Sequence, residues 1–450
     1  MGATPLGWIG ILRLALVQAS LGSIVVLTTS TLNRIMVVEL GLAATIPGAL
    51  VGLHYGVQIA RPLWGHGSDR GGRRTPWIIG GVALLAFAGT GAAVATAVMA
   101  EHFALGLTLA ILDFMLIGFG VGAAGTSLLA LLASKVAPER RPAAATVVWV
   151  MMIFGIAVTA IVSGRFLDPF SMERLIEVTA VTGLLALAVT WIAVAGVEGP
   201  APEAAVPKEG RAPPAATFRE SLEDAWADPA ARLFTIFVFV SMLGYSMQDL
   251  ILEPFAGLVF AMTPGQTTTL SGIQNGGVFM GMGLVGIAGS LLAKSHPWLL
   301  RAFTVGGCVA SGLALAMLAA SAWAPSSWPL TANVFALGFA NGVFAVAAIA
   351  SMMALAGAAG PSRVGLRMGL WGAAQAIAFG LGGFAGTVAV DMVRVLGGAI
   401  PLAYGSVFLL EGAIFLAAAG LAHRIGIMNA TTPSPGHKRI AYAATIEGAQ

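Results

Sequence analysis

The chain has 450 residues, of which 58% are hydrophobic and only 10% are charged, and its formal net charge is +3. Soluble domains carry roughly 25% charged residues, so a chain this poor in charge cannot cover a water-facing surface. The composition therefore excludes an ordinary soluble fold and predicts a protein whose solvent is lipid.

Twelve apolar runs follow one another along the chain, each long enough to cross the ~30 Å hydrocarbon layer as a helix of about 20 residues. None has the polar–apolar alternation of a barrel strand, and backbone groups in lipid must be bonded internally, so we predict an all-α membrane protein. The predicted spans are 12–36, 43–62, 76–99, 104–133, 143–165, 175–196, 232–254, 268–292, 300–322, 328–356, 367–391 and 399–422.

A long connection rich in Pro and Ala separates the sixth span from the seventh. Near its end, Phe218, Leu222 and Trp226 share one face of a short amphipathic helix, which either lies on the membrane surface or covers the bundle. The predicted organisation is an N-terminal six-helix half at 1–197, a cytoplasmic linker at 198–231, a C-terminal six-helix half at 232–422 and a cytoplasmic tail at 423–450.

The two halves resemble each other at a nearly constant offset. Three pairs of matching positions have almost the same separation along the chain: Arg13 and Arg232, Gly118 and Gly338, and Trp149 and Trp371. A constant offset across several spans predicts a duplicated six-helix unit. Two such units, related by an axis along the membrane normal, form the pseudo-symmetric halves of the major facilitator architecture.

Lysine and arginine are distributed unevenly between the connections. With the N-terminus placed in the cytoplasm, 19 of the 23 lie on the cytoplasmic side, and the other four are Arg34, Arg165, Arg174 and Arg394. Because the cytoplasmic loops of membrane proteins are rich in Lys and Arg, this split predicts a multi-pass protein with both termini in the cytoplasm.

The stretch WGHGSDRGGRRTP at 64–76, between the second and third spans, gathers charges that are scarce elsewhere. It resembles the signature loop of the major facilitator superfamily through Gly65, Asp69, Gly72, Arg73 and Arg74. Glycines permit a tight turn, and Asp69 can lie near a helix N-terminus and pair with an arginine. The resemblance implies a clasp between the halves in one conformation; the alternative is that the arginines only anchor the loop in the cytoplasm.

Ionisable side chains inside the spans are functional candidates, because lipid makes them costly. Arg34, which follows Asn33, and Glu253 are separated by the same offset as Arg13 and Arg232, and they lie near the outer ends of the first and seventh spans. We therefore predict an ion pair between Arg34 and Glu253 that joins the halves, unless Arg34 extends to the outer surface instead.

Other polar groups lie deeper in the spans. His54 and Gln58 share one helix face, and this imidazole can either bind the magnesium of a chlorin ring or form one hydrogen bond between helices. Gln274, Asn275 and Asn341 either line an interior cavity or bond neighbouring helices. The predicted contacts of a pigment or substrate are His54, Gln58, Asn33, Arg34, Glu253, Gln274, Asn275 and Asn341.

The sequence has no phosphate-binding loop, zinc spacing or nucleophile elbow, and its one cysteine, Cys308, lies in an apolar run. The basic residues are spread over loop ends rather than gathered on one face, which argues against a nucleic-acid partner. We therefore predict no catalytic residues and no metal site, and we do not expect an enzyme.

The strings TLNRIMVVELG at 31–41 and RRTPWIIGG at 73–81 closely resemble the PucC/LhaA family, also called the bacteriochlorophyll delivery family, of purple phototrophic bacteria. The resemblance implies an assembly factor in the bacterial inner (intracytoplasmic) membrane. Such a factor delivers or shields bacteriochlorophyll, with carotenoid, and holds antenna polypeptides. The short segment before Leu12 favours the branch linked to the peripheral, LH2-type antenna.

Two other functions stay open. A proton-coupled secondary transporter of a small solute would use Asp113 or Glu253 as its titrating group. A scaffold would contact antenna polypeptides through its outer helices without binding pigment.

Tags inserted after positions 170 and 395 are expected to be reachable from the outer side of intact spheroplasts, and a tag after position 210 only after lysis. Protease accessibility measures this. If the tags at 170 and 395 were reachable only from the cytoplasm, the twelve-span topology would be wrong.

Overall fold

The computed structural model describes residues 6–58, 73–137, 140–198, 226–292, 296, 298–358 and 364–431. Within these ranges every regular element is a helix, as predicted. Most of the predicted linker, with Phe218 and Leu222, and the end of the tail lie outside the described residues.

The first and seventh spans are composite. The first consists of α1 (Trp8–Val26), the π-helix η1 (Leu27–Thr31), α2 (Leu32–Arg34) and the π-helix η2 (Ile35–Glu39). The seventh consists of α10 (Pro229–Met247), the 3-10 helix η5 (Gln248–Leu250) and α11 (Leu252–Phe260).

The other ten spans are single helices. They are α3 (Thr45–Val57), α5 (Thr75–Glu101), α6 (Phe103–Lys135), α7 (Arg141–Leu167), α8 (Met172–Val194), α12 (Pro264–Leu292), α13 (Leu299–Ser321), α14 (Leu330–Ala358), α15 (Val364–Val395) and α16 (Ile400–Thr431).

Ten of the described spans are long and apolar enough to cross a membrane, and α3 and α12 complete the predicted twelve. The last helix runs past the predicted boundary at 422 to Thr431, because no proline interrupts the chain between Pro401 and Pro433.

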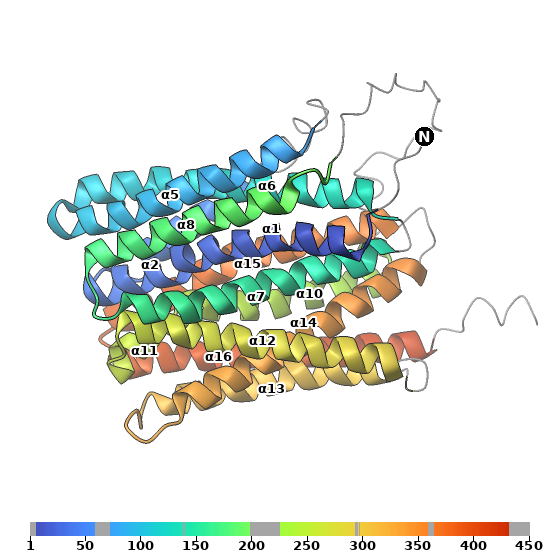
Figure 1. The fold of residues 1–450 in the computed structure, drawn as a ribbon. Coiled ribbons are helices and arrows are strands. Elements are labelled where there is room, and N and C mark those ends of the chain that lie inside the picture. The colour runs from blue at the N-terminus through green and yellow to red at the C-terminus, as the bar shows by residue number, and fades with distance from the viewer. Residues whose placement is uncertain are drawn as a thin grey trace, which may run out of the picture.

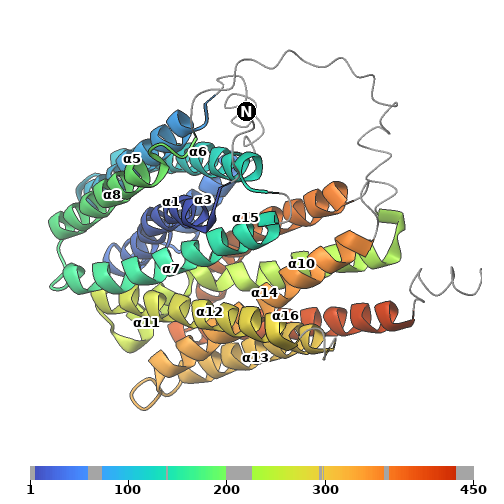
Figure 2. The ribbon, with the colours of Figure 1, turned by 45° about the vertical axis from the view of Figure 1, so that its right-hand side comes forward.

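The spans form a bundle of antiparallel rods in two groups, one from the N-terminal half and one from the C-terminal half (Figures 1 and 2). The groups meet along two seams, where α7 packs against α12 and α3 packs against α15. We call the end with Trp8, Thr75 and Leu299 the basic end, because the predicted cytoplasmic Lys and Arg lie there, and the other end, with Glu39 and Phe260, the far end.

Small residues let the helix backbones approach closely within each half. A Cβ atom on Gly338 or Gly342 would collide with the backbone carbonyl oxygens of Gln274 and Val278 on α12. In the other half, a Cβ on Gly118 would lie 2.7 Å from the carbonyl oxygen of His54 on α3. The glycine spacings are therefore packing positions, and they occupy equivalent places in the two halves.

The seams between the halves are tight only toward the far end. There, Gly48 of α3 faces Thr387 with no room for a Cβ, and a Cβ on Gly164 of α7 would lie 2.6 Å from the Gly265 carbonyl oxygen. Nearer the basic end, a Cβ on Gly56 or Gly276 would meet nothing within 4 Å. The halves are therefore packed backbone to backbone at the far end, whereas nearer the basic end larger side chains such as Phe154 and Phe279 make the contact, with ring centroids 5.7 Å apart.

Gly338→Ala is expected to lower the thermal unfolding midpoint of the detergent-solubilised protein by several degrees, because overpacking of a tight contact costs about 1–3 kcal/mol. Gly306→Ala on α13 is the matched control, since a Cβ there meets nothing within 4 Å. Equal midpoints for the two variants would contradict this account of the α12–α14 contact.

Candidate functional site

The two composite spans face each other across the interface between the halves. Both depart from regular α-helix at the same level, at 27–39 in the first span and at 248–251 in the seventh. π-Helical turns are rare and frequent at functional sites, and a broken helix leaves backbone carbonyls free to accept hydrogen bonds. This pair of irregular segments is the candidate functional site.

Hydrogen bonds join the two irregular segments and their neighbours. The Asn33 amide Nδ2 donates to the carbonyl oxygen of Leu250, at the break in the seventh span, over 2.6 Å. The hydroxyls of Thr31 and Thr268 lie 3.1 Å apart and form a second bond between the halves. Asn33 is 1% exposed and its Oδ1 has no hydrogen-bond partner among the described residues.

Arg34 does not form the predicted ion pair with Glu253. Its guanidinium pairs with Glu39, and its Nη2 donates to the carbonyl oxygen of Met262 over 2.8 Å. The reason is the π-helical turn, which places the side chain five residues later beside Arg34, where an α-helix would place the fourth. Arg34 still joins the halves, through the Met262 carbonyl, and at 2% exposed it does not extend to the surface.

Glu253 turns toward α12 instead. Its Oε1 accepts a hydrogen bond from the Ser271 hydroxyl over 2.6 Å, and its Oε2 has no partner among the described residues. The side chains of Gln248 and Glu411 are also fully buried, and neither side chain forms a hydrogen bond with a described residue. Each buried polar atom without a hydrogen bond lowers the stability of the fold by roughly 1–3 kcal/mol. A polar ligand or a proton that satisfies these atoms would therefore stabilise this region.

Aromatic side chains continue from this region across the middle of the bundle. Tyr55 of the N-terminal half lies against Phe379, with ring centroids 6.5 Å apart, and Phe379 lies against Tyr245 at 5.7 Å. All three are half-buried, as is Asp249, one helical turn from Tyr245. The interior between the halves therefore offers flat apolar faces beside a carboxylate at mid-depth.

His54 is deeply buried on α3 and shares its face with Gln58, as predicted. The Gln58 Nε2 and the His54 Nε2 lie 3.0 Å apart, so one ring nitrogen is engaged by the amide. A pigment metal reaches that nitrogen only after Gln58 moves away. The role of His54 as a ligand therefore stays a prediction.

The other predicted polar residues bond within the C-terminal half. Asn341 accepts a hydrogen bond from the Ser311 hydroxyl over 2.8 Å, between α14 and α13. The Asn275 amide donates to the Ser271 carbonyl oxygen over 2.9 Å, and Gln274 is 7% exposed. Asn341 lies away from the seam, so the structure does not bring the eight predicted contacts together into one site.

Two carboxylates cap helices across the seams at the far end. Asp391 of α15 accepts from the backbone N–H groups of Ala44 and Thr45, over 3.1 and 2.7 Å, at the start of α3. Asp168, after α7, accepts from the Thr263 hydroxyl over 2.6 Å and from the Gly265 N–H over 3.2 Å, at the start of α12. We call these contacts the far-end caps. Each satisfies free N–H groups and places a negative charge at the positive end of a helix dipole, which is stabilising.

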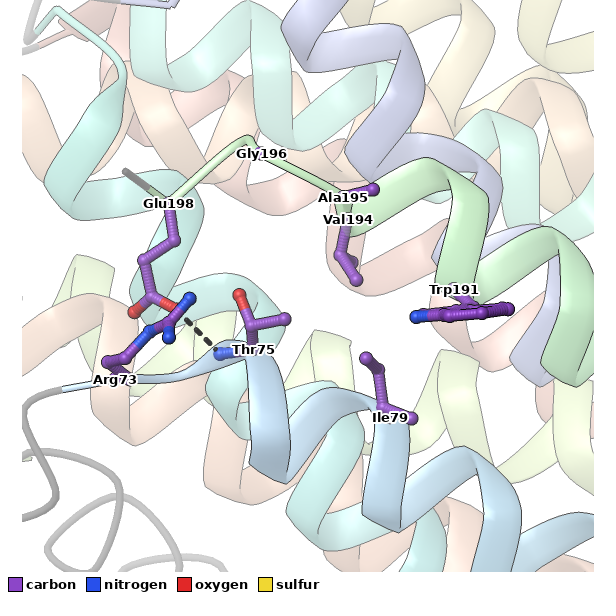
Figure 3. Close-up of a pocket in the computed structure, with 8 residues that line it drawn as sticks. All are labelled: Arg73, Thr75, Ile79, Trp191, Val194, Ala195, Gly196 and Glu198. Atoms are coloured by element: carbon purple, nitrogen blue, oxygen red, sulfur yellow. Dashed lines mark hydrogen bonds between the residues drawn. The ribbon is translucent and has the colours of Figure 1, made fainter. Parts of the chain in front are cut away.

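At the basic end, a cavity of about 450 Å³ lies between α5 and α8 (Figure 3). Its lining residues are Arg73, Thr75, Ile79, Trp191, Val194, Ala195, Gly196 and Glu198. Glu198 accepts hydrogen bonds from the backbone N–H groups of Arg74 and Thr75, and so caps the start of α5. Arg74 donates to the Ala130 carbonyl oxygen over 2.9 Å at the end of α6.

Of the predicted loop motif, only Arg73 and Arg74 are described. Arg74 bonds helix ends within the N-terminal half, and Arg73 lies in the cavity lining with Glu198. Gly65, Asp69 and Gly72 lie outside the described residues, so the predicted clasp stays a prediction.

The pKa of Glu198 lies below its usual range. Burial raises this pKa, but the hydrogen bonds from Thr75 and Arg74 and the charge of Arg73 outweigh the burial. A carboxyl group with a lowered pKa contributes stability at neutral pH, and that contribution is lost as the pH falls through the folded-state pKa.

Comparison with known proteins assigns the chain to a family. The family described as PUCC protein matches residues 31–430. The chain belongs to the PucC family. The resemblance of the 31–41 and 73–81 strings to this family is therefore confirmed.

Among relatives, the chain is 52% identical to the protein named Bacteriochlorophyll synthase 44.5 kDa chain of Rhodobacter capsulatus, over 93% of this chain and 95% of the relative. It is 30% identical to Protein PucC of the same organism, over 92% of this chain and 91% of that protein. Within the PucC family, this chain is therefore nearer to the first of these two relatives than to the second.

Solved structures confirm the major facilitator fold. A peptide transporter in complex with sulfate has a TM-score of 0.67 at 14% identity, covering 95% of this chain and 96% of that chain. The nucleoside transporter NupG has a TM-score of 0.66 at 15% identity, covering 92% and 99%. At this identity the likeness concerns the fold, which this PucC-family protein shares with transporters.

Sequence reasoning missed several residues that matter to this PucC-family structure: Glu39 as the partner of Arg34, Gln248 at the break, Glu198 as the cap of α5, and the capping roles of Asp168 and Asp391. One signal was available for the caps. The separation of Asp168 and Asp391 along the chain is close to the offset of the internal repeat, and each stands at the far end of its span.

Replacing both capping carboxylates, in Asp168→Asn with Asp391→Asn, is expected to shift the protein toward a state open at the far end. An amide lacks the charge that opposes the helix dipole and offers one acceptor oxygen in place of two. Alkylation of a cysteine placed at Thr387 is expected to become severalfold faster, since Gly48 covers this site. Glu173→Gln, an exposed far-end carboxylate, is the control; equal alkylation rates in all variants would contradict the capping role.

Proposed function

We propose that this protein is a membrane assembly factor that delivers or shields bacteriochlorophyll for a bacterial light-harvesting antenna. The observation that carries the proposal is membership of the PucC family, together with 52% identity to a relative whose name refers to bacteriochlorophyll synthesis. Carotenoid is a second pigment candidate, and antenna polypeptides are the proposed recipients. The setting is the bacterial inner (intracytoplasmic) membrane, with both termini in the cytoplasm.

The interior between the halves suits a flat apolar ligand with one polar attachment point. Tyr55, Phe379 and Tyr245 present ring faces, and His54, Gln58 and Asp249 lie near them along the same spans at mid-depth. Ligand sites of this kind are mostly apolar, with a few placed polar groups. A chlorin held there is separated from the far side by the far-end caps.

The fit to a pigment rests on the donor set. An imidazole nitrogen is a ligand that the magnesium of a chlorin accepts, and the His54 Nε2 is held by a neutral amide that can be exchanged. In this proposal Gln58 keeps His54 oriented until the pigment takes its place.

We propose that the protein is not an enzyme, although one relative is named as a synthase chain. The fold is that of transporters, and the polar groups of the candidate site hold helices together rather than surround a reacting centre. The choice of antenna is part of the proposal. The LH2-type antenna is our first candidate, although identity to the protein named PucC is lower than identity to the synthase-named relative.

A proton-coupled secondary transporter is the second candidate function. The buried Glu411 and Glu253, with partnerless carboxylate oxygens among the described residues, favour it, because groups of this kind take up and release protons in membrane transport. A scaffold that contacts antenna polypeptides without pigment is the remaining alternative.

Protein purified in mild detergent from a pigment-producing host is expected to carry near-infrared absorbance. His54→Ala should reduce the absorbance per protein severalfold, because the proposed metal ligand is lost. His102→Ala, an exposed histidine at the far end, should leave it unchanged.

Other results would redirect the assignment. A colourless wild-type protein that changes the pH inside vesicles when a solute is added would replace the proposal with transport. A colourless protein that retains antenna polypeptides would replace it with a scaffold.

A further inference from the structure

Asp113 is an ionisable residue on the outside of the bundle at mid-membrane. It lies on α6, half-buried, ten residues from the far end of that helix, which is about 15 Å at 1.5 Å per residue. α5 and α6 form one edge of the bundle (Figures 1 and 2). The neighbouring side chains on this surface are apolar and exposed, with Leu112 53% and Phe87 71% exposed.

The Asp113 carboxyl group lies against Gly91 of α5, where a Cβ would come within 2.5 Å of its Oδ1. A glycine at this position therefore makes the notch that holds the carboxyl group. Asp113 has no hydrogen bond or ion pair with any residue that the structure describes; the hydroxyl of Thr90, next to Gly91, donates to the Ala86 carbonyl oxygen instead. A carboxyl group in hydrocarbon without a donor is costly, and membrane proteins reserve such positions for function.

The C-terminal half provides an internal comparison. Asn333 is the repeat mate of Asp113, because these two positions have the same separation along the chain as Gly118 and Gly338. Asn333 is 4% exposed, accepts from the Trp328 indole N–H over 3.0 Å and donates to the Ala314 carbonyl oxygen over 3.0 Å. The polar side chain at this position is therefore fully hydrogen-bonded in the C-terminal half, whereas in the N-terminal half it lies at the surface without a hydrogen bond to a described residue.

We propose that the α5–α6 surface around Asp113 is a docking site for a transmembrane helix of a partner protein, one that presents a side-chain N–H donor at mid-membrane. The donor would complete the hydrogen bond that Asp113 lacks within the described part of its own chain. The helix itself would lie along the exposed small and apolar positions of α5, including Gly80 and Val94.

A helix suits this surface better than a small ligand does. Helix association in lipid depends on small residues that allow close approach and on hydrogen bonds between polar side chains, and both occur here. The described cavity on α5 lies at the basic end, at Thr75 and Ile79, and not beside Asp113 and Gly91. The inference rests on the proposed function only for the identity of the partner, an antenna polypeptide.

A synthetic helix tests this surface directly. The probes are two poly-leucine transmembrane peptides, one with a central asparagine and one with leucine there, in vesicles that contain the protein labelled at Glu101→Cys. Cys308 is buried and does not compete for the label. The asparagine peptide is expected to bind about tenfold more tightly in energy-transfer titrations, the effect of one interhelical hydrogen bond in lipid.

Variants of the protein distinguish an effect on peptide binding from an effect on the stability of the fold. Asp113→Leu should abolish the difference between the peptides and raise the thermal unfolding midpoint, since it removes a polar group from lipid. Asp113→Asn should keep most of the difference, because an amide oxygen still accepts. Leu185→Ala on α8, another exposed lipid-facing position, should change neither measurement.

Equal binding of the two peptides to the wild type, or a difference that persists in Asp113→Leu, would overturn the proposal. Self-association of labelled protein that depends on Asp113 would assign the surface to a second copy of this chain instead. Loss of near-infrared absorbance in Asp113→Leu, with unchanged peptide binding, would make it a pigment contact. Pigment absorbance that is absent from all variants, with peptide binding intact, would contradict only the proposed function.

Discussion

The far-end caps are the contacts on which the conformation of this protein depends. Asp391 belongs to the C-terminal half and caps the first turn of α3 in the N-terminal half. Asp168 belongs to the N-terminal half and caps the first turn of α12 in the C-terminal half. They act where glycines already bring the backbones together, so packing and electrostatics reinforce each other at the same end. The closest backbone approach between the halves is therefore at the far end, at Gly48 and Gly164.

The polar interior follows from the same closure. Irregular turns in the first and seventh spans meet across the interface, where Asn33 and Arg34 donate to backbone carbonyl oxygens of the other half. The Leu250 carbonyl lies at the break in the seventh span, and the Met262 carbonyl lies just after the end of α11. An interior built this way can change partners as the halves move, because carbonyl acceptors are interchangeable whereas a buried ion pair between halves is costly to separate.

The outer surface of the bundle differs from its interior in how polar groups are satisfied. Asn333 in one half is fully bonded, whereas its repeat mate Asp113 faces the membrane beside Gly91. This difference between equivalent positions is the basis for the proposed docking surface on the N-terminal half. In this protein the N-terminal half carries that exposed carboxyl group.

The sequence by itself determined the twelve spans, the paired halves, the basic end and the polar positions at 33, 34, 54 and 253, because hydrophobicity, charge and the repeat offset can be read along the chain without knowledge of its contacts. It also carried the family strings at 31–41 and 73–81. Only the tertiary structure decided the partners. The pairing of Arg34 with Glu39 rather than Glu253 depends on a π-helical turn, and the capping by Asp391 depends on contact between the start of α3 and the end of α15, which are distant in sequence. Composition and periodicity carry no information about such contacts.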